Sequence, residues 1–480
     1  MAVIAWCEEG WLLDHMSWWR RSYSLPETCE PVIQRNFTQT GDKLPDDINT
    51  AVHGTCDISQ LAGGNSILSN LTVQNQYKYI PKQELFSIFH PYLMDSEFEN
   101  YAARLRPSAV TTADPEKIEA GKKRKRKRKH KDDEYLLQDD KMTECISQAM
   151  KSLVKLGLLT GHFRELSTLP INNNTEARQL AKQDSSDMAV SVGNVLEPVC
   201  EGLATVVLSA GQCYSYPELC HTLYKHEGPT PMVIRCDGHQ YVVPPYSGFC
   251  LSQAAGIRSF ISALDGEKFD LIVMDPPWEN KSVKRKKMYY TLPNWDLQDL
   301  PIPDLARDRC LLAVWVTNKH KHQDYVRHVL FPRWSVKHLA DWYWLKVTVA
   351  GEPITGLASH CKKPYESLIL GRYQPNHHGI ERTDNPLGSP PEDKVVMSVP
   401  CILHSKKPPI DALLTDYCNE KPHCLELFAR NLRPGWISWG NEVLRHQHLK
   451  FYDVSTCSSE TSCNGAEDRD HTSTQHSGKI

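Results

Sequence analysis

The sequence lacks the features that mark secreted, membrane-spanning and zinc-binding proteins. No stretch approaches the roughly 18 uninterrupted apolar residues of a membrane span, and the apolar start is shorter than a signal-peptide core. The 16 cysteines include no Cys-x-x-Cys pair, so we expect reduced thiols and no metal site. Together these absences predict an intracellular protein with no membrane partner.

The chain also lacks a large net charge, but its charges are unevenly distributed. Lys+Arg 55 against Asp+Glu 58 gives -3. Residues 241–452 hold 27 basic and 22 acidic residues, a net of +5, which leaves 28 basic and 36 acidic residues, a net of -8, elsewhere. Nine of those 28 lie in the run 122–131. The net charge of the whole chain therefore combines unlike parts and says nothing about binding partners. The distribution of the charges along the chain is informative about them.

At 480 residues the chain is long for one domain, since a domain usually has about 100–200 residues. The basic run repels itself and cannot be buried, so it is expected to lie outside any fold and to act as a nuclear-localisation signal, with some cytoplasmic presence also compatible. A solvated tail or a nonspecific phosphate-binding segment is the alternative. We predict a poorly structured region 1–121, the nuclear-localisation-like run 122–134, a helical region 135–230, a catalytic domain 231–453 and a disordered tail 454–480.

Apolar runs alternate with helical stretches in the second half of the chain, and an amphipathic helix is expected over 139–156. Alternation of this kind predicts an α/β fold with a mostly parallel sheet covered on both faces. Such sheets bind ligands at the carboxyl ends of their strands. The strands are expected at 269–274, 310–316, 365–370, 395–399 and 425–428, with helices at 324–330 and 410–417.

The most informative motif is Asp275-Pro276-Pro277-Trp278, directly after an apolar strand. Two prolines remove two backbone donors and leave carbonyl groups able to accept. The Asp275 carboxylate and the Pro276 carbonyl can therefore accept both hydrogens of one amine, while Trp278 offers a flat face to a planar base. This combination suits an exocyclic amine on an aromatic ring. A proline-rich strand end with a core tryptophan is the structural alternative.

A basic and aromatic segment follows this motif. Basic side chains bind phosphates and aromatic rings stack on unpaired bases, so the segment predicts contact with a nucleic acid. A solvated charged loop is the alternative. Because the exocyclic amine of a base lies in the pairing edge of a duplex, such a target must be single-stranded or flipped out. The candidate substrate-binding residues are Asn280, Lys281, Lys284, Arg285, Lys286, Lys287, Tyr289 and Tyr290.

The Asp-Pro-Pro-Trp motif resembles the signature of the adenosine N6-methyltransferases named after the seventy-kilodalton subunit of the messenger-RNA enzyme. Residues from about 235 to 452 follow this family, and they are most similar to its methyltransferase-like-four branch. The further matching segments are Asn280-Lys281-Ser282-Val283-Lys284-Arg285, Trp315-Val316-Thr317-Asn318, Lys363-Pro364-Tyr365-Glu366, His404-Ser405-Lys406-Lys407-Pro408, Glu426-Leu427-Phe428-Ala429-Arg430-Asn431 and Trp436-Ile437-Ser438-Trp439-Gly440-Asn441-Glu442.

This resemblance implies a Rossmann-like, S-adenosylmethionine-dependent methyltransferase of permuted order, with the catalytic motif first and a mostly α or disordered N-terminal region. The family lacks a glycine-rich cofactor loop, so polar side chains are expected to hold the cofactor. By family position, Asp275, Arg430, Asn441 and Glu442 contact it, and Lys363 occupies the place of a lysine in a different register. Ser247, Gly248 and Phe249 are expected to approach its adenine.

The resemblance also limits the candidate activities. The branch is associated with an internal 2′-O-methyladenosine of a spliceosomal small nuclear RNA, and DNA activity is also attributed to it. We therefore expect RNA methylation, with DNA adenine methylation as the alternative. A catalytically silent nuclear RNA-binding subunit is a second alternative, although silent members have a degraded signature whereas Asp275 and Trp278 are intact. No obligate protein partner is indicated.

Overall fold

The computed structural model describes residues 2–23, 77–92, 131–164, 174–175, 177–179, 204–278, 297–357, 363–375, 387–403 and 405–456. The chain divides into two units, Met1–Leu25 with Tyr79–Val454, and Pro26–Lys78 with Ser455–Ile480. All of the elements below belong to the first unit, apart from the outer ends of β3 and β17.

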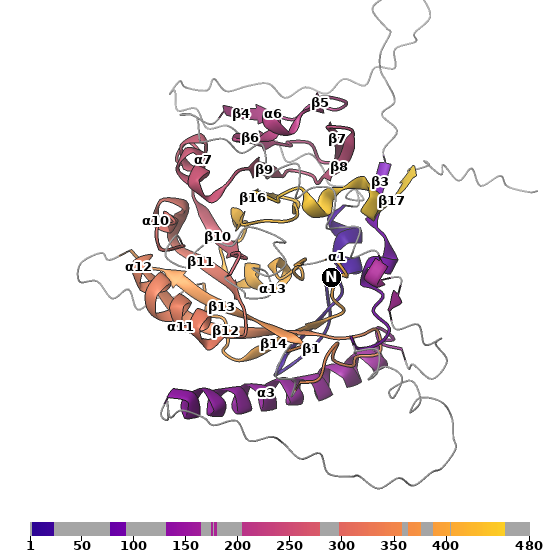
Figure 1. Cartoon of the computed structure of the whole chain (residues 1–480), viewed down its shortest axis with the longest axis vertical. Helices are drawn as coiled ribbons and strands as arrows, with labels where there is room; N and C mark the ends of the chain where they lie inside the picture. The colour runs from indigo at the N-terminus through magenta and orange to yellow at the C-terminus, as the bar shows by residue number, and fades with distance from the viewer. Residues whose placement is uncertain are drawn as a thin grey trace, which may run out of the picture. The chain divides into compact units, whose positions relative to one another are not determined.

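A twelve-stranded mixed sheet organises this unit (Figure 1). Most of its neighbouring strands are parallel, including β10 with β11 and β15, whereas β13 runs antiparallel to both β11 and β12. The α/β fold expected from the sequence is therefore confirmed. In sheet order the strands are β1 (Val3–Cys7), β2 (Gly10–Leu13), β14 (Lys394–Ser398), β12 (Val336–Lys346), β13 (Tyr365–Tyr373), β11 (Ala306–Val316), β10 (Phe269–Met274), β15 (Cys424–Leu427), β16 (Trp436–Gly440), β9 (Gly248–Leu251), β6 (Thr222–Lys225) and β4 (Ala204–Val207).

The central strands are buried on both faces, as continuous apolar runs predict. Alternate side chains of β10 enter different cores: Ile272 and Met274 pack into one cluster, Leu271 and Val273 into another. Helices and turns cover the first cluster, and α13 (Asp411–Leu414) packs into the second. The helices that contribute to the first cluster are α7 (Ile257–Ala263), α10 (Ile302–Leu305), α11 (His320–Tyr325), the π-helical turn η4 (Val326–Leu330) and α12 (Phe331–Arg333).

Two smaller sheets and several short helices complete the described part. One sheet contains β5 (Cys213–Tyr214), β7 (Met232–Cys236) and β8 (His239–Val243), and the other pairs β17 (Tyr452–Thr456) with β3 (Tyr77–Pro81). No described helix has the length and apolar character to cross a membrane. The remaining elements are α1 (His15–Ser22), η1 (Gln83–Phe86), α3 (Lys131–Leu159), α6 (Tyr216–Leu219), η3 (Ala254–Gly256), η5 (Thr415–Tyr417), η6 (Arg445–Gln447) and η7 (Leu449–Phe451).

The expected helix over 139–156 lies within α3, which runs along the edge of the sheet formed by β1, β2 and β14 (Figure 1). Its apolar residues Ile146, Ala149 and Leu153 are buried against Leu12 and the neighbouring strands. The 3–4 residue spacing of apolar positions therefore identified both the helix and its buried face.

Two of the expected domain boundaries are wrong. Residues 2–23, expected to be poorly structured, form β1, β2 and α1, and β2 pairs in parallel with β14. Residues 204–225, expected to be helical, supply β4 and β6 to the same sheet. Strand β2 joins the main sheet through β14, and β6 joins it through β9, and both of these partners lie outside the segments concerned, so the local apolar pattern did not reveal their place in the sheet. The runs 122–130 and 457–480 lie outside the described residues.

Candidate active site

The carboxyl ends of four parallel strands meet at one edge of the sheet. Asp275 follows β10, Thr317 and Asn318 follow β11, Phe428 follows β15, and Asn441 follows β16. The parallel registers of β10 with β11, β10 with β15 and β15 with β16 place these residues side by side. This edge is where open α/β sheets bind their ligands.

Two antiparallel strands bring further charged side chains to the same edge. Because β13 runs against β11, its first residues lie beside the end of β11, where Ser367 pairs with Val316. Glu366 is the residue before Ser367. Strand β12 runs against β13 in turn, so its last residue, Lys346, returns to this edge next to Tyr365. The sheet topology therefore brings the anion of Glu366 and the cation of Lys346 to the same edge as Asp275.

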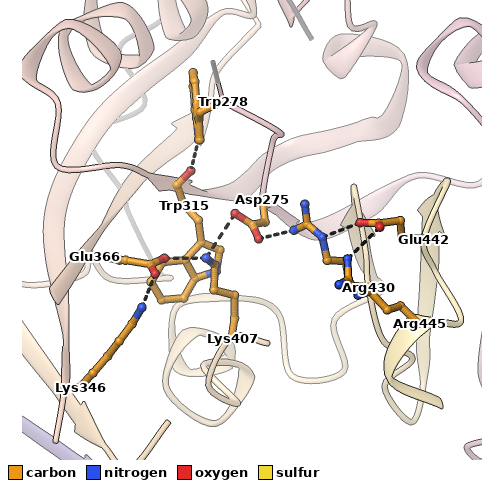
Figure 2. A network of polar contacts seen from close by, with 9 residues as sticks. All are labelled: Asp275, Trp278, Trp315, Lys346, Glu366, Lys407, Arg430, Glu442 and Arg445. Carbon is orange, nitrogen blue, oxygen red and sulfur yellow. Dashed lines mark hydrogen bonds and ion pairs between the residues drawn. The ribbon is translucent and has the colours of Figure 1, made fainter. Parts of the chain in front are cut away.

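Asp275 is the centre of a network of ion pairs (Figure 2). Its Oδ2 accepts a hydrogen bond from Nη1 of Arg430 at 2.8 Å, and its Oδ1 lies 3.4 Å from Nζ of Lys407. The Asp275 and Arg430 side chains are 14% and 10% exposed, and that of Lys407 is 8% exposed. Two nearly buried cations thus hold the carboxylate in one orientation at the end of β10.

Lys407 also binds a second carboxylate. Its Nζ donates to Oε2 of Glu366 at 2.5 Å, and Lys346 donates to the other oxygen of Glu366. Burial acts to raise the pKa of Glu366, but the charges of Lys346 and Lys407 outweigh it and hold that pKa far below its usual range. For Lys407 burial acts to lower the pKa, and Asp275 with Glu366 reverses this so that it is raised. The lysine and Glu366 therefore remain charged at neutral pH.

Arg430 is held from its other side by Glu442. Nε of Arg430 donates to Oε2 of Glu442 at 2.9 Å, and Nη1 of Arg445 donates to Oε1 at 2.8 Å. The carboxylate of Glu442 therefore bridges two arginines, and Arg430 bridges two carboxylates (Figure 2). Because its Nε and Nη1 donate to different carboxylates, the plane of the Arg430 guanidinium group is fixed.

The turn that carries Arg430 has an unusual backbone. Phe428, directly after β15, has φ of 59°, a left-handed conformation that a bulky residue rarely adopts. The buried Phe428 ring packs edge-on against Trp439 at 5.6 Å, and the Ala429 amide donates to the Trp439 carbonyl at 3.0 Å. Strain of this type is found at functional sites, where packing pays for it. A packed phenylalanine, not a glycine, makes the turn that aims Arg430 at Asp275.

Trp278 lies beneath this edge as part of the apolar core. It is 6% exposed, its indole N–H donates to the Trp315 carbonyl at 2.8 Å, and its ring stacks on His322 with centroids 5.1 Å apart. Its backbone amide donates to the Pro276 carbonyl at 2.8 Å. These contacts favour a supporting role in which Trp278 fixes the Pro276-Pro277 turn, and stacking on a substrate base stays a prediction.

Three of the expected cofactor residues lie elsewhere. Strand β9 runs parallel to β16, and its first residue, Gly248, pairs with Ile437 whereas its last, Leu251, pairs with Gly440. Ser247, Gly248 and Phe249 therefore lie toward the opposite edge from Asp275, and Phe249 is fully buried against Tyr224. Their contact with the adenine stays a prediction, and the direction of β9 disfavours it. The residues of this segment at the correct edge are Leu251 and Ser252.

The other expected residues divide between those at the site and those outside it. Arg430 and Glu442 join the network, and the exposed Asn441 lies beside Glu442 at the end of β16. Lys363 instead donates to the Leu357 carbonyl at 3.2 Å. The expected substrate-binding residues 280–290 lie outside the described residues.

Four charged residues of the network had no expected role: Lys346, Glu366, Lys407 and Arg445. Glu366 and Lys407 lie in segments that were noted for their family resemblance, so a signal existed for them. Lys346 ends a strand that the sequence did not reveal, and only the antiparallel pairing of β12 with β13 brings it to Glu366. Among the described residues, no group of three or more His, Cys, Asp or Glu side chains is arranged to hold a metal ion.

Comparison with known proteins identifies related chains. Residues 269–442 match the MT-A70 family. The N(6)-adenine-specific methyltransferase METTL4 of Mus musculus is 34% identical over 484 residues, covering 94% of this chain and 98% of that protein. The N6-methyladenosine RNA methyltransferase MTA1 of Cryphonectria parasitica is 34% identical over 46% of this chain and 66% of its own length. The DNA N6-methyl methyltransferase of Caenorhabditis elegans is 34% identical over 48% of this chain and 60% of its own length.

Proposed function

Because this chain belongs to the MT-A70 family and is an adenine N6-methyltransferase that acts on nucleic acid, we propose that it methylates RNA with S-adenosylmethionine as the methyl donor. The proposed target is a 2′-O-methyladenosine of a spliceosomal small nuclear RNA. One observation carries the proposal: the Asp275 carboxylate is held at the carboxyl edge of the sheet by Arg430 and Lys407.

The side chains at this edge fit S-adenosylmethionine, which carries a carboxylate, an ammonium group and ribose hydroxyls. Arg430 and Lys407 can bind an anionic group, while Asp275 and Glu442 can accept from an ammonium or a hydroxyl. Oδ1 of the nearby Asn318 is buried and has no hydrogen-bond partner among the described residues, so it offers a further acceptor. When bound there, S-adenosylmethionine supplies an electrophilic methyl group.

Asp275 and Pro276 are proposed to hold the adenine amine. A carbonyl oxygen has two lone pairs, and the Pro276 carbonyl uses one for the Trp278 amide, so it can still accept one N6 hydrogen. Asp275 accepts the other. These two bonds favour a pyramidal nitrogen with its lone pair directed away from Asp275. Removal of a proton beforehand is not required, because the N6 proton becomes acidic once the nitrogen is alkylated.

The ion-pair network gives this geometry its precision. Lys407 holds Oδ1 of Asp275, and Glu366 holds Lys407, so the carboxylate does not need to be reoriented when the amine arrives. Placing reacting atoms about 3–3.5 Å apart in the correct orientation can lower a barrier by about 7–11 kcal/mol. Positioning therefore supplies most of the rate acceleration in this proposal.

The choice of RNA rests on sequence and on relatives. Five basic residues between Lys281 and Lys287 suit a phosphate backbone, and Tyr289 and Tyr290 suit unpaired bases. The basic run 122–131 suits a nuclear protein, so we propose nuclear localisation. One similar protein is an RNA methyltransferase and another a DNA methyltransferase, which makes DNA the second candidate.

The test supplies purified protein with labelled S-adenosylmethionine and either small nuclear RNA or DNA oligonucleotides, followed by mass spectrometry of the nucleosides. We expect N6-methylated adenosine, or its 2′-O-methyl form, from RNA, and a loss of at least about 100-fold in Asp275→Ala. Methylation of DNA alone would replace the RNA assignment. Equal N6-methyl signals from wild type and Asp275→Ala would overturn the catalytic assignment.

A further inference from the structure

A cavity of about 530 Å³ lies outside the active site, on the small sheet of β5, β7 and β8. The β7–β8 turn and the segment 448–450 form its walls. The turn consists of Asp237 and Gly238, both with positive φ, as tight hairpins require. The adenine-methylating chemistry described above uses none of these residues.

The permanently charged side chains that line this cavity are two cations and one carboxylate. Arg235 on β7 is exposed and Lys450 is half-buried, and both line it together with His239 and His448. The carboxylate in the lining is that of Asp237, whose Oδ2 accepts from the Tyr216 amide at 2.8 Å. A concave surface with two permanent cations and one engaged carboxylate favours an anionic ligand.

The two histidines add a hydrogen-bond donor of fixed direction. The Lys450 amide donates to Nδ1 of His448 at 3.1 Å, so in the neutral ring Nε2 of His448 carries the hydrogen. That Nε2 lies 3.2 Å from Nδ1 of His239 and donates to it. His239 must then carry its own hydrogen on Nε2. The backbone amide thus sets both tautomers and leaves His239 as an N–H donor in a cavity with Arg235 and Lys450.

The cavity is connected to the active site through a short stretch of chain. Arg445, at one end of the network that begins at Asp275, precedes His448 by three residues, which limits their Cα separation to about 11 Å. The contacts from Asp275 through Arg430 and Glu442 to Arg445 are direct. A single strand of a few nucleotides is longer than this step from Arg445 to His448.

We propose that this cavity binds a backbone phosphate of the RNA substrate, several nucleotides from the adenosine that is methylated. Arg235 and Lys450 supply the charge, and His239 donates through Nε2. This inference rests on the proposed RNA substrate and adds a second, sequence-independent contact to it. Phosphate contacts of this type set register and affinity without reading bases.

The experiment measures binding of fluorescein-labelled single-stranded RNA, 5 or 20 nucleotides long with one central adenosine, by anisotropy over a range of salt concentrations. The full-length proteins are wild type, Arg235→Ala, Lys450→Ala and the double variant. Lys337→Ala, an exposed basic residue of β12, is the matched control. We expect each cavity variant to bind the 20-nucleotide RNA roughly 3–10-fold more weakly and to lower the salt slope by about 0.7. Binding and methylation of the 5-nucleotide RNA should stay unchanged.

Other outcomes separate the two proposals. If wild type binds and methylates the long RNA and the double variant does so equally well, the cavity assignment is wrong while the proposed function stands. Equal losses of binding affinity for both RNA lengths would also overturn the cavity assignment, because the substitutions would then act through the active site or the fold. If inorganic phosphate stabilises wild type and not the double variant, with no difference in RNA binding, the cavity binds free phosphate instead. If wild type binds neither RNA, the proposed function itself fails.

Discussion

At the scale of single residues, the position of Asp275 depends on the charges of the side chains around it. Lys407 contacts Asp275 and Glu366 at once, and Lys346 holds the far side of Glu366. Neutralising Glu366 therefore leaves Asp275 as the anion that Lys407 contacts, and it allows the ammonium group of Lys407 to move toward Asp275. The consequence for Asp275 is a change of orientation and not a loss of charge.

Glu366→Gln is expected to lower kcat about 10–100-fold and to leave the KM for the methyl donor within about threefold, because a displacement of about 1 Å at the reacting group is costly. Steady-state methylation assays measure both constants. Glu267→Gln, which removes ion pairs with the more exposed Lys225 and His423, is the control and should match wild type. A raised KM with unchanged kcat would show that Glu366 holds the cofactor instead of positioning Asp275.

The same variant has a defined pH signature. The pKa of Glu366 is lowered in the folded state, so its contribution to stability is present above its unfolded pKa of about 4.3 and is lost as the pH falls below that value. The difference in unfolding free energy between wild type and Glu366→Gln should therefore be constant from pH 7 to pH 5. It should shrink as the pH falls below about 4.3.

His15 is expected to make the free energy of unfolding depend on pH between pH 7 and pH 5, above the range in which Glu366 acts. Burial, together with the charges of Lys406 and Arg433, lowers its pKa from 6.5 to about 3, and its Nε2 lies 3.1 Å from Ser398 Oγ. Between these values the unfolded chain binds a proton that the folded chain does not, so stability falls as the pH falls below 6.5. The wild type should lose about 2 kcal/mol between pH 7 and pH 5 through this one group.

Urea unfolding of wild type and His15→Gln at pH 7 and pH 5 measures this contribution. The variant should be less stable at pH 7 and should lose about 2 kcal/mol less on acidification. The pKa of His162 is also lowered by burial, but His162 is present in both proteins and cancels in the difference. Parallel pH profiles for the two proteins would show that His15 is protonated in the folded state.

At the scale of elements, the close approach of β2 to β14 depends on one glycine. A Cβ added at Gly10 would lie 1.9 Å from the Val395 carbonyl oxygen, which is backbone and cannot rotate away. Gly10→Ala should therefore separate the two strands and lower the free energy of unfolding by about 1–3 kcal/mol. Gly356→Ala, where a Cβ meets nothing within 4 Å, is the matched control for thermal melting. If the two variants melt alike, β2 does not pair with β14.

The elements that could be predicted are those whose signal is local. The strands β10, β11, β13, β14 and β15 and the helix α3 are confirmed, because continuous apolar runs and 3–4 residue spacing are visible in a short window. Strands β2 and β6 have four residues each. Although β2 also pairs with the adjacent β1, the partners β14 and β9 that join β2 and β6 to the rest of the sheet lie outside a short window. The direction of β9 was likewise not visible in the sequence, and it places Ser247 to Phe249 toward the edge opposite Asp275.

The candidate site could likewise be predicted only where its residues belong to a local motif. Asp275 and Arg430 belong to compact motifs and meet in the structure at 2.8 Å. Lys346 and Glu366 meet only because β12 and β13 are antiparallel, and their separation of 20 residues carries no chemical pattern. Residue type and motif therefore predict the reacting group, whereas the residues that position it follow from topology.

At the scale of the whole molecule, the N-terminal segment is part of the core that supports the site. The indole N–H of Trp18 donates to Asp411, which pairs with Arg433. Arg433 pairs in turn with Glu426 on β15, the strand beside β10. Lys406, next to Lys407, lies over the ring of Trp19. A chain of polar contacts thus links α1 to the strand that aims Arg430.

Removal of residues 1–23 should consequently destabilise the catalytic unit, although none of these residues lies at the active site. Leu12 and Leu13 are fully buried and Trp19 is 3% exposed, and each such side chain contributes about 1.5–3 kcal/mol by burial. We expect the shortened protein to aggregate or to melt at least about 10 °C lower than the full chain.

A protein lacking residues 457–480 is the control, and it also tests the expectation that this tail is disordered. Trp18→Phe keeps an aromatic ring in the core and removes the bond to Asp411, so it should fold and show a smaller loss of stability together with a reduced kcat. If the protein without residues 1–23 melts within about 2 °C of the full chain and retains its methylation rate, β1, β2 and α1 are not part of the catalytic unit.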